Sequence, residues 1–277
     1  MSQISPLNIT VLANRDLAST VALNLLLPEL IQFGHRVRVF LSARVGKAKP
    51  QPGPLEELKF FEQTLFNEIL FPALGDSITG HWRSYDGLGG QIGQEFEILN
   101  RINSAAGLET LRAAAPDLIL SIRYGGILKA KAIAVPRLGV LNLHSGLLPQ
   151  YRGVMATFWA LLNGDRELGT TLHTIDDGTI DTGSILGQTR LDVVPGRSYL
   201  WHVLQLYPDG CRQMLDAVAR LAAGETLDRR PQPEDGAYYT FPTPSDLSAF
   251  TDAGYRLYDH GEIVEIARRF FTPDSSS

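Results

Sequence analysis

The sequence of 277 residues predicts an α/β protein in which a mostly parallel, twisted sheet is flanked by helices. Two observations lead to this prediction. First, a strand pattern, a helix pattern and a second strand pattern follow one another within residues 7–41. That order is typical of a βαβ unit, and such units build parallel sheets with right-handed crossovers. Second, residues 117–122 are almost continuously apolar, as strands between two helical layers are.

The first βαβ unit begins with residues 7–13, which are apolar and β-branched and favour a buried strand. In the helix that follows, either Asp16 or Ser19 is suited to cap the amino end, and Gly34 to end the last turn. Pro28 interrupts the helical pattern, so we expect it to kink or divide the helix. Residues 36–41 predict the second strand.

The rest of the chain alternates between helix and strand patterns. Residues 75–93 are rich in Gly, Ser and Asp and predict a loop. In a sheet of this kind, ligands bind at the carboxyl ends of the strands. Further helices are expected at residues 55–72, 95–114 and 199–223, and further strands at residues 117–122, 139–144, 170–175 and 185–194.

The carboxyl-terminal part, residues 236–277, predicts a small mixed α/β extension. It should contain a helix capped by Ser245, a short strand at residues 255–258 and a final helix. The expected organisation is therefore a main domain at residues 1–235 followed by this extension.

Composition narrows the classes of function. The formal net charge of −5 argues against a general affinity for nucleic acids, because that affinity depends on Lys and Arg. The apolar stretch at residues 21–31 is much shorter than the roughly 20 residues of a membrane span. Residues 1–12 lack the basic residue that opens a secretory signal, so we expect a cytoplasmic protein without membrane contact. The single Cys211 agrees with a reducing compartment.

A pair of polar residues, Asn142 and His144, ends the strand at residues 139–144. Because strand side chains alternate, both point to the same face. An amide NH₂ and a protonated imidazole form a donor pair that can stabilise an oxyanion during acyl transfer. An isolated Asn-x-His also fits two side chains that merely satisfy backbone groups at a strand end.

The residues that follow this pair are more specific. Residues 145–153 read Ser-Gly-Leu-Leu-Pro-Gln-Tyr-Arg-Gly, residues 169–173 read Gly-Thr-Thr-Leu-His, and Asp181-Thr-Gly183 comes next. In order and spacing these motifs resemble the folate-dependent formyltransferase family, which includes glycinamide ribonucleotide formyltransferase and the amino-terminal domain of methionyl-tRNA formyltransferase. The resemblance implies a Rossmann-like formyltransferase fold, with residues 1–235 as the catalytic domain.

By motif position, the catalytic Asn, His and Asp of that family correspond to Asn142, His144 and Asp181. In its reaction an amine attacks the formyl carbon of 10-formyltetrahydrofolate, and negative charge builds on the formyl oxygen. Asn142 and protonated His144 would stabilise that charge. Asp181 would favour the charged form of His144 and take up the amine proton, directly or through a water. Asp176 and Asp177 compete for this last role.

The resemblance also implies where the folate would bind. Residues 121–129 resemble the loop in which backbone groups and apolar side chains hold the pterin ring, although the same residues fit an ordinary strand and glycine turn. No metal is predicted, and His173 fits a structural role as well as a functional one. The expected folate-binding residues are Arg123, Tyr124, Gly126, Ile127, Leu128, Val140, Ile175, Asp177 and Gly178.

The expected acceptor is a small-molecule amine of a specialised biosynthetic pathway. Residues 14–16 follow the first strand where a phosphate-binding enzyme would have a glycine-rich turn, which argues against glycinamide ribonucleotide. The acidic chain and its short mixed α/β end argue against tRNA. An amino-sugar nucleotide remains, as does hydroxyornithine or another amino acid precursor. Arg15, Arg123 and Arg152 are candidates to hold a carboxylate or phosphate of the acceptor.

Three other functions stay open. One is hydrolysis of formyltetrahydrofolate, although the family's deformylase carries an amino-terminal regulatory domain and the predicted sheet here begins at Leu7. Another is dinucleotide binding, which expects Gly-x-Gly-x-x-Gly after the first strand, whereas residues 12–19 contain no glycine. The third is a non-catalytic interaction module. The aromatic residues Tyr238, Tyr239 and Phe241 would suit packing on the core or on a second copy in a homodimer.

Overall fold

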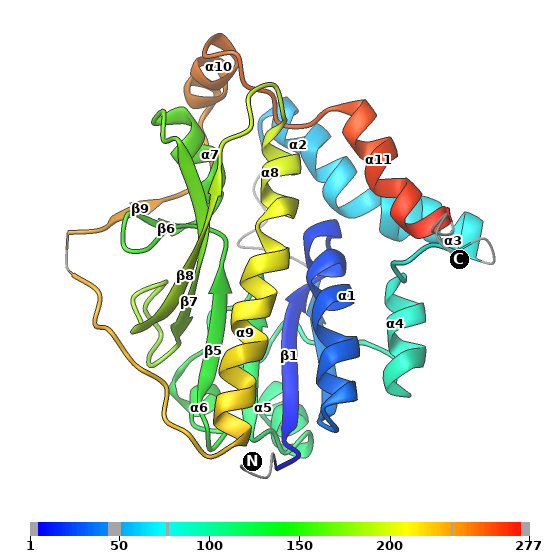
Figure 1. Cartoon of the computed structure of the whole chain (residues 1–277), viewed down its shortest axis with the longest axis vertical. Coiled ribbons are helices and arrows are strands. Elements are labelled where there is room, and N and C mark those ends of the chain that lie inside the picture. The colour runs from blue at the N-terminus through cyan, green and yellow to red at the C-terminus, as the bar shows by residue number, and fades with distance from the viewer. Residues whose placement is uncertain (1–4, 44–50, 76–77, 234, 273–277) are drawn as a thin grey trace.

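The computed structural model describes residues 5–43, 51–75, 78–233 and 235–272 and shows a sheet between two helical layers (Figure 1). Seven strands form this sheet in the order β3-β2-β1-β4-β5-β7-β8. The strands from β3 to β5 are parallel, whereas β7 runs antiparallel to both β5 and β8. The predicted α/β class with a mostly parallel sheet is confirmed.

The strands are β1 (Asn8–Asn14), β2 (Arg36–Ser42), β3 (Glu97–Ile98), β4 (Leu118–Ile122), β5 (Val140–His144), β6 (Tyr151–Gly153), β7 (Glu167–Thr174), β8 (Ile185–Asp192) and β9 (Ala237–Tyr239). The helices are α1 (Leu17–Gln32), α2 (Gly53–Lys59), the π-helix η1 (Phe60–Leu70), α3 (Phe71–Leu74), α4 (Tyr85–Ile92), α5 (Ala105–Ala113), α6 (Ala130–Ile133), α7 (Ala156–Leu162), α8 (Tyr199–Gln205), α9 (Tyr207–Ala222), α10 (Pro244–Asp252) and α11 (His260–Phe271).

The sheet separates two apolar cores. On one face, α1 and α9 pack against each other and cover a large core that includes Leu120 and Leu143. On the other face, α5 and α6 cover a smaller core that includes Ile119 and Val140. Neighbouring residues of one strand belong to different cores because strand side chains alternate between the faces.

Helix α1 is continuous and begins and ends where the sequence predicts. The Asp16 side chain caps its amino end, and Gly34, with φ +81°, follows its last turn. Of the two effects expected of Pro28, a kink or a division, the division does not occur. Leu27 and Leu30, on either side of the proline, are both completely buried, so tertiary packing holds the two parts on one core.

The loop prediction for residues 75–93 is wrong in its second half, where α4 lies. Ser84 caps this helix, and Leu88 packs into the large core beside α1. Its glycines conceal the helical pattern in the sequence. Gly89 is needed for packing, because a Cβ atom there would lie 2.6 Å from the carbonyl oxygen of Gln94.

The predicted strand at residues 255–258 is also wrong. The carbonyl groups of Arg256 and Leu257 accept hydrogen bonds from the N–H groups of Tyr199 and Leu200 in the first turn of α8. Such N–H groups have no partner within their own helix. The extended segment therefore caps a helix and does not pair in a sheet.

The carboxyl-terminal segment packs against the residues that follow β5. Strand β9 pairs with β6, and the Tyr239 ring stacks on Tyr151 at a centroid distance of 5.5 Å. Helix α10 is capped by Thr243 in a capping box with Asp246, so the cap predicted at Ser245 is wrong by two residues. Among the residues that the structure describes, no helix combines the length and apolar character needed to cross a membrane.

Candidate functional site

The polar residues predicted to carry chemistry gather where β5 and β7 lie side by side. Asn142 of β5 is paired with His173 of β7, and His144 is the last residue of β5. Asp181 lies in the connection from β7 to β8 and has φ +55°. We call Asn142, His144, His173 and Asp181 the β5 cluster. The sequence left the role of His173 undecided, and the structure places it in this cluster.

The Asp181 carboxylate lies between the two histidines of the β5 cluster. Its Oδ2 atom is 3.5 Å from His144 Nδ1, and its Oδ1 atom is 3.5 Å from His173 Nε2. The N–H of Gly153 donates to Oδ2 at 2.9 Å. The Asn142 amide nitrogen is 3.0 Å from His173 Nε2. The four side chains of the β5 cluster therefore form one chain of polar contacts, from Asn142 through His173 and Asp181 to His144.

Electrostatics in this cluster keep Asp181 ionised. Burial alone would raise the pKa of its carboxyl, but His144, His173 and the Gly153 N–H outweigh burial and hold the pKa at about 2. His144 Nε2 lies 2.7 Å from the carbonyl oxygen of Tyr151. Both ring nitrogens of His144 thus face oxygen atoms that can accept a hydrogen bond.

A brace of hydrogen bonds holds the Asp181 loop. Gln232 Nε2 donates to the carbonyl oxygens of Asp181 and Gly183 at 2.9 and 2.7 Å. Arg152 Nη2 donates to Gln232 Oε1 and to the carbonyl oxygen of Pro233, both at 3.1 Å. Arg152 was expected to hold an anionic group of the acceptor, and here its guanidinium is engaged in this brace.

Gly183 explains the Asp-x-Gly spacing of the motif. A Cβ atom at this position would lie only 1.7 Å from the carbonyl oxygen of Thr174. At the neck of the same loop, the Thr174 N–H donates a hydrogen bond to the carbonyl oxygen of Ser184 at 3.0 Å. Only glycine permits this approach, so the loop closes and returns Asp181 to the end of β5.

The two competing carboxylates have other partners. Asp176 accepts a hydrogen bond from the Thr174 hydroxyl and pairs with Arg229 at 3.6 Å. Asp177 is exposed, and hydrogen bonds from Thr179 lower the pKa of its carboxyl. Geometry therefore favours Asp181 for the role that the sequence left open among the three.

The apolar residues expected to line the folate site come together on the α5–α6 face. Leu128 and Val140 are buried in the smaller core, and Tyr124 and Ile175 pack against it. A Cβ atom on Gly126 would lie 2.8 Å from the Tyr124 ring. Of the four other expected residues, Ile127 is 53% exposed, Asp177 is exposed, and Gly178 lies near the carbonyl oxygen of Leu128. The fourth is Arg123.

Arg123 belongs to a second polar group, at the carboxyl ends of β1 and β4. Its Nε atom is 2.9 Å from Asp16 Oδ2, and its Nη2 atom is 3.6 Å from Glu62 Oε1 of η1. Asn67 of η1 donates to the carbonyl oxygen of Arg15 at 3.5 Å. We call Asp16, Glu62, Asn67 and Arg123 the β1 cluster. The Arg15 side chain, a candidate for acceptor binding, is exposed beside it.

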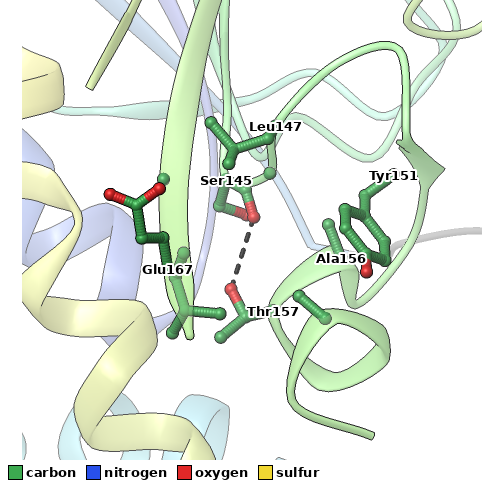
Figure 2. A pocket seen from close by; sticks show the side chains of 10 residues that line it. Ser145, Leu147, Tyr151, Ala156, Thr157 and Glu167 are labelled. Atoms are coloured by element: carbon green, nitrogen blue, oxygen red, sulfur yellow. Dashed lines mark hydrogen bonds between the residues drawn. The ribbon is translucent and has the colours of Figure 1, made fainter. Parts of the chain in front are cut away.

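A small cavity under residues 145–151 is too small for a substrate (Figure 2). Its volume is about 10 Å³, which corresponds to a single water. Figure 2 shows the Thr157 hydroxyl donating to the carbonyl oxygen of Ser145 at its edge. In the described part of the chain, no group of three or more His, Cys, Asp or Glu side chains is arranged to hold a metal ion.

Comparison with known proteins gives a family for the segment that contains the β5 cluster. Residues 99–200 match the sequence profile of the formyl transferase family. Methionyl-tRNA formyltransferase of Burkholderia multivorans is 37% identical over 136 residues, which are 49% of this chain and 41% of that relative. The chain thus matches less than half of the length of this relative. The resemblance to the formyltransferase family is confirmed.

Solved structures of formyltransferases share the fold. Glycinamide ribonucleotide transformylase 1 of Symbiobacterium toebii has a TM-score of 0.57 at 19% identity, covering 83% of this chain and 96% of that one. A sugar N-formyltransferase of a Shewanella species has a TM-score of 0.55 at 15% identity, covering 88% and 87%. An N-formyltransferase of Helicobacter canadensis, solved with folinic acid and dTDP-3-aminofucose, has a TM-score of 0.53 at 16% identity, covering 83% and 70%.

Proposed function

We propose that this chain, whose residues 99–200 match the formyl transferase family, transfers the formyl group of 10-formyltetrahydrofolate to the amine of a small molecule. The observation that carries the proposal is the β5 cluster, in which the Asp181 carboxylate is 3.5 Å from both His144 and His173. Formyl transfer to an amine needs donors for the developing oxyanion and a base for the amine proton. The cluster offers both at one strand end.

The donors of the oxyanion are Asn142 and His144. The Asn142 amide has two N–H groups, so one can face His173 while the other is directed at the formyl oxygen. His144 supplies a second donor by exchanging the carbonyl oxygen of Tyr151 for the formyl oxygen. When bound, 10-formyltetrahydrofolate supplies the formyl carbon that the amine attacks.

Asp181 is the proposed base. As the amine nitrogen forms its bond to the formyl carbon, it loses a proton to the Asp181 carboxylate, directly or through one water. That proton then replaces the formyl group on the folate nitrogen when the old carbon–nitrogen bond breaks. A carboxylate with a pKa of about 2 stays ionised near neutral pH, and the Gly153 N–H keeps it oriented.

We assign the pterin ring to the α5–α6 face. Tyr124, Leu128, Val140 and Ile175 offer an apolar wall there, and β5 continues from Val140 to Asn142 on the same face. The backbone of residues 176–178 would supply polar contacts to the ring edge. These are side chains of the kind that line small-molecule sites. We further propose that residues 1–235 form the catalytic part and residues 236–277 an extension that supports it.

Two measurements test the proposal. Isothermal titration with folinic acid should show binding to the wild-type protein and to a His144→Ala variant. A panel of amino-sugar nucleotides, hydroxyornithine and simple amino acids should then give amine-dependent release of tetrahydrofolate with the wild type and none with His144→Ala. Release that needs no amine would identify a hydrolase instead, and absence of folinic acid binding would overturn the proposal.

A further inference from the structure

The β1 cluster is the second place where charged side chains gather at the carboxyl edge of the sheet. Asp16 follows β1, Arg123 follows β4, and Glu62 and Asn67 come from η1, which packs on α1. Solvent reaches part of the cluster, because the Arg123 side chain is 20% exposed and the Glu62 side chain 12%. The formyl-transfer steps proposed above do not use it.

The amino terminus of α1 in this cluster is already occupied by a carboxylate of the chain itself. Asp16 Oδ1 accepts the Ser19 N–H at 2.7 Å, and Oδ2 accepts from Asn14 and Arg123, each at 2.9 Å. A helix amino terminus after the first strand would otherwise attract a phosphate. Asp16 takes up these donors, so the site is unsuited to a phosphorylated ligand.

Two other oxygens of the cluster lack donors. Glu62 Oε1 and Asn67 Oδ1 are buried and, among the described residues, have no hydrogen-bond partner, although Arg123 Nη2 forms an ion pair with Glu62 Oε1 at 3.6 Å. Asn67 is 5% exposed, and its amide lies against the Arg15 carbonyl, next to Asp16. Such buried acceptors are costly when left unpaired, at about 1–3 kcal/mol each. They indicate a ligand that donates hydrogen bonds.

The shape of η1 places Glu62 and Asn67 on neighbouring positions of the same helix face. Phe60–Leu70 is π-helical, so its backbone bonds join residues five apart, and Glu62 and Asn67 have this separation. An α-helical turn would offset them further around the helix axis. π-Helical turns are frequent at functional sites, because they realign side chains toward one point.

The charge of the cluster favours a cation. Asp16 and Glu62 stand against the single guanidinium of Arg123, and around them lie the phenol groups of Tyr85, Tyr199 and Tyr207 from α4, α8 and α9. Burial raises the pKa of the Glu62 carboxyl to about 7, with Arg123 opposing and Asp16 adding to the effect. An ammonium group beside Glu62 would compensate the excess negative charge.

The β1 and β5 clusters lie within reach of one molecule. Ile122 of β4 is paired with Leu143 of β5, so the next residues, Arg123 and His144, end neighbouring strands. β1 is the following strand on the other side of β4. Two strand spacings amount to about 10 Å. The residues assigned to the pterin lie on the α5–α6 face, whereas Asp16 and Glu62 approach from the α1 side.

We propose that the β1 cluster is a specificity subsite for a second amino group of the acceptor, which is a non-phosphorylated diamine or diamino acid. One amino group docks as an ammonium on Glu62 Oε1 and Asn67 Oδ1, and the other receives the formyl group at Asn142 and His144. This inference rests on the proposed function, since it names the substrate class of the same site. The proposed subsite favours amino acid precursors over sugar nucleotides, because the negative diphosphate of a sugar nucleotide would lie beside the acidic side chains of Asp16 and Glu62.

Matched probes test this subsite on the full-length protein saturated with folinic acid. The probes are 1,5-diaminopentane, L-lysine and L-ornithine, the monoamine pentylamine, and O-phosphoethanolamine as the phosphorylated amine. Calorimetry should show at least one of the three diamino probes binding tenfold or more tightly than pentylamine. Glu62→Gln should remove that preference while folinic acid still binds as in the wild type. Glu68→Gln, an exposed position on the same π-helix, is the control and should leave every affinity unchanged.

The outcomes separate the two proposals. If the wild type binds folinic acid but prefers O-phosphoethanolamine, or binds the diamino probes no better than pentylamine, the subsite proposal is overturned and the formyltransferase proposal stands. A diamino preference that survives in Glu62→Gln overturns it as well. Asn67→Leu provides an independent check, since loss of that amide oxygen should also weaken diamino binding. Failure to bind folinic acid would overturn the formyltransferase proposal and, with it, the assignment of the β1 cluster as an acceptor subsite.

Discussion

The two polar clusters at the carboxyl edge of the sheet differ in how complete they are. In the β5 cluster, the Asp181 carboxylate meets His144, His173 and the Gly153 N–H, and its pKa is held at about 2. In the β1 cluster, the Glu62 carboxyl has one cation, Arg123 at 3.6 Å, no hydrogen bond to Oε1 among the described residues, and a pKa of about 7. Where the residues of a site already pair with one another, their side chains are held in position for catalysis. Where buried acceptors lack hydrogen bonds, a bound ligand can supply them.

The largest expected effect comes from breaking the complete cluster with Asp181→Asn. An amide cannot accept the amine proton and removes the negative charge beside His144, so kcat for formyl transfer should fall about 10³-fold. Folinic acid binding, measured by calorimetry, should be unchanged. Asp177→Asn, in the same loop but exposed, is the matched control and should keep near wild-type activity. A larger loss in the control would move the role of base to Asp177.

A second variant changes Gly153, whose backbone N–H donates a hydrogen bond to Asp181. Gly153 has φ +97°, and a Cβ atom there would lie 2.1 Å from the carbonyl oxygen of Tyr239. Gly153→Ala should therefore lower the free energy of unfolding by about 4 kcal/mol, from backbone strain plus overpacking. Gly164→Ala has positive φ but open space around the Cβ position, so it should cost only about 1 kcal/mol. Chemical denaturation of both variants checks the difference, and equal losses would contradict it.

Glu62 of the β1 cluster should make the free energy of unfolding depend on pH. Because the folded pKa of Glu62 is about 7 and its ordinary value is 4.5, the folded protein binds more protons than the unfolded chain in this window. Stability from Glu62 is therefore greatest below pH 4.5 and falls as pH rises to 7, by about 3 kcal/mol. Glu62→Gln cannot ionise, so its unfolding free energy should lack this fall.

Asp181 should change the free energy of unfolding with pH in the opposite direction to Glu62, so the two carboxyls can be compared in the same protein. Its folded pKa of about 2 lies below the ordinary 3.8, so its contribution is present above pH 3.8 and is lost as pH falls toward 2. Subtracting the curve of each variant from that of the wild type isolates each carboxyl. Differences of the same sign for Glu62→Gln and Asp181→Asn would show that the two clusters do not differ as described.

The smallest expected effect concerns the brace of the Asp181 loop. Gln232→Ala removes both bonds to the carbonyl oxygens of Asp181 and Gly183, and kcat should fall about tenfold while folinic acid affinity stays the same. Arg152→Ala should act through the same brace. The double variant should therefore lose little more than Gln232→Ala alone. Additive losses would indicate that Arg152 contacts the acceptor directly.

Local rules were enough to predict much of the β5 cluster. Asn142 and His144 share a face because of the two-residue period of a strand, and the Asp-x-Gly motif with Asp181 follows at the spacing of the family. The β1 cluster offered no such signal. Glu62 and Asn67 stand in a segment with an ordinary helical pattern, and only its π-helical course and its packing on α1 bring Glu62 to Arg123 and Asn67 to the Arg15 carbonyl.

By itself, the sequence determined the α/β class, the order of most strands and helices, and the identity of the catalytic candidates. These depend on hydrophobic periods, caps and motifs that lie within a few residues of one another. Tertiary structure alone decided that α1 continues through Pro28, that residues 255–258 cap α8, and that Arg123 turns to Asp16 and Glu62. Each of these depends on contacts between residues far apart in the chain, whose packing and charge energies outweigh local propensity.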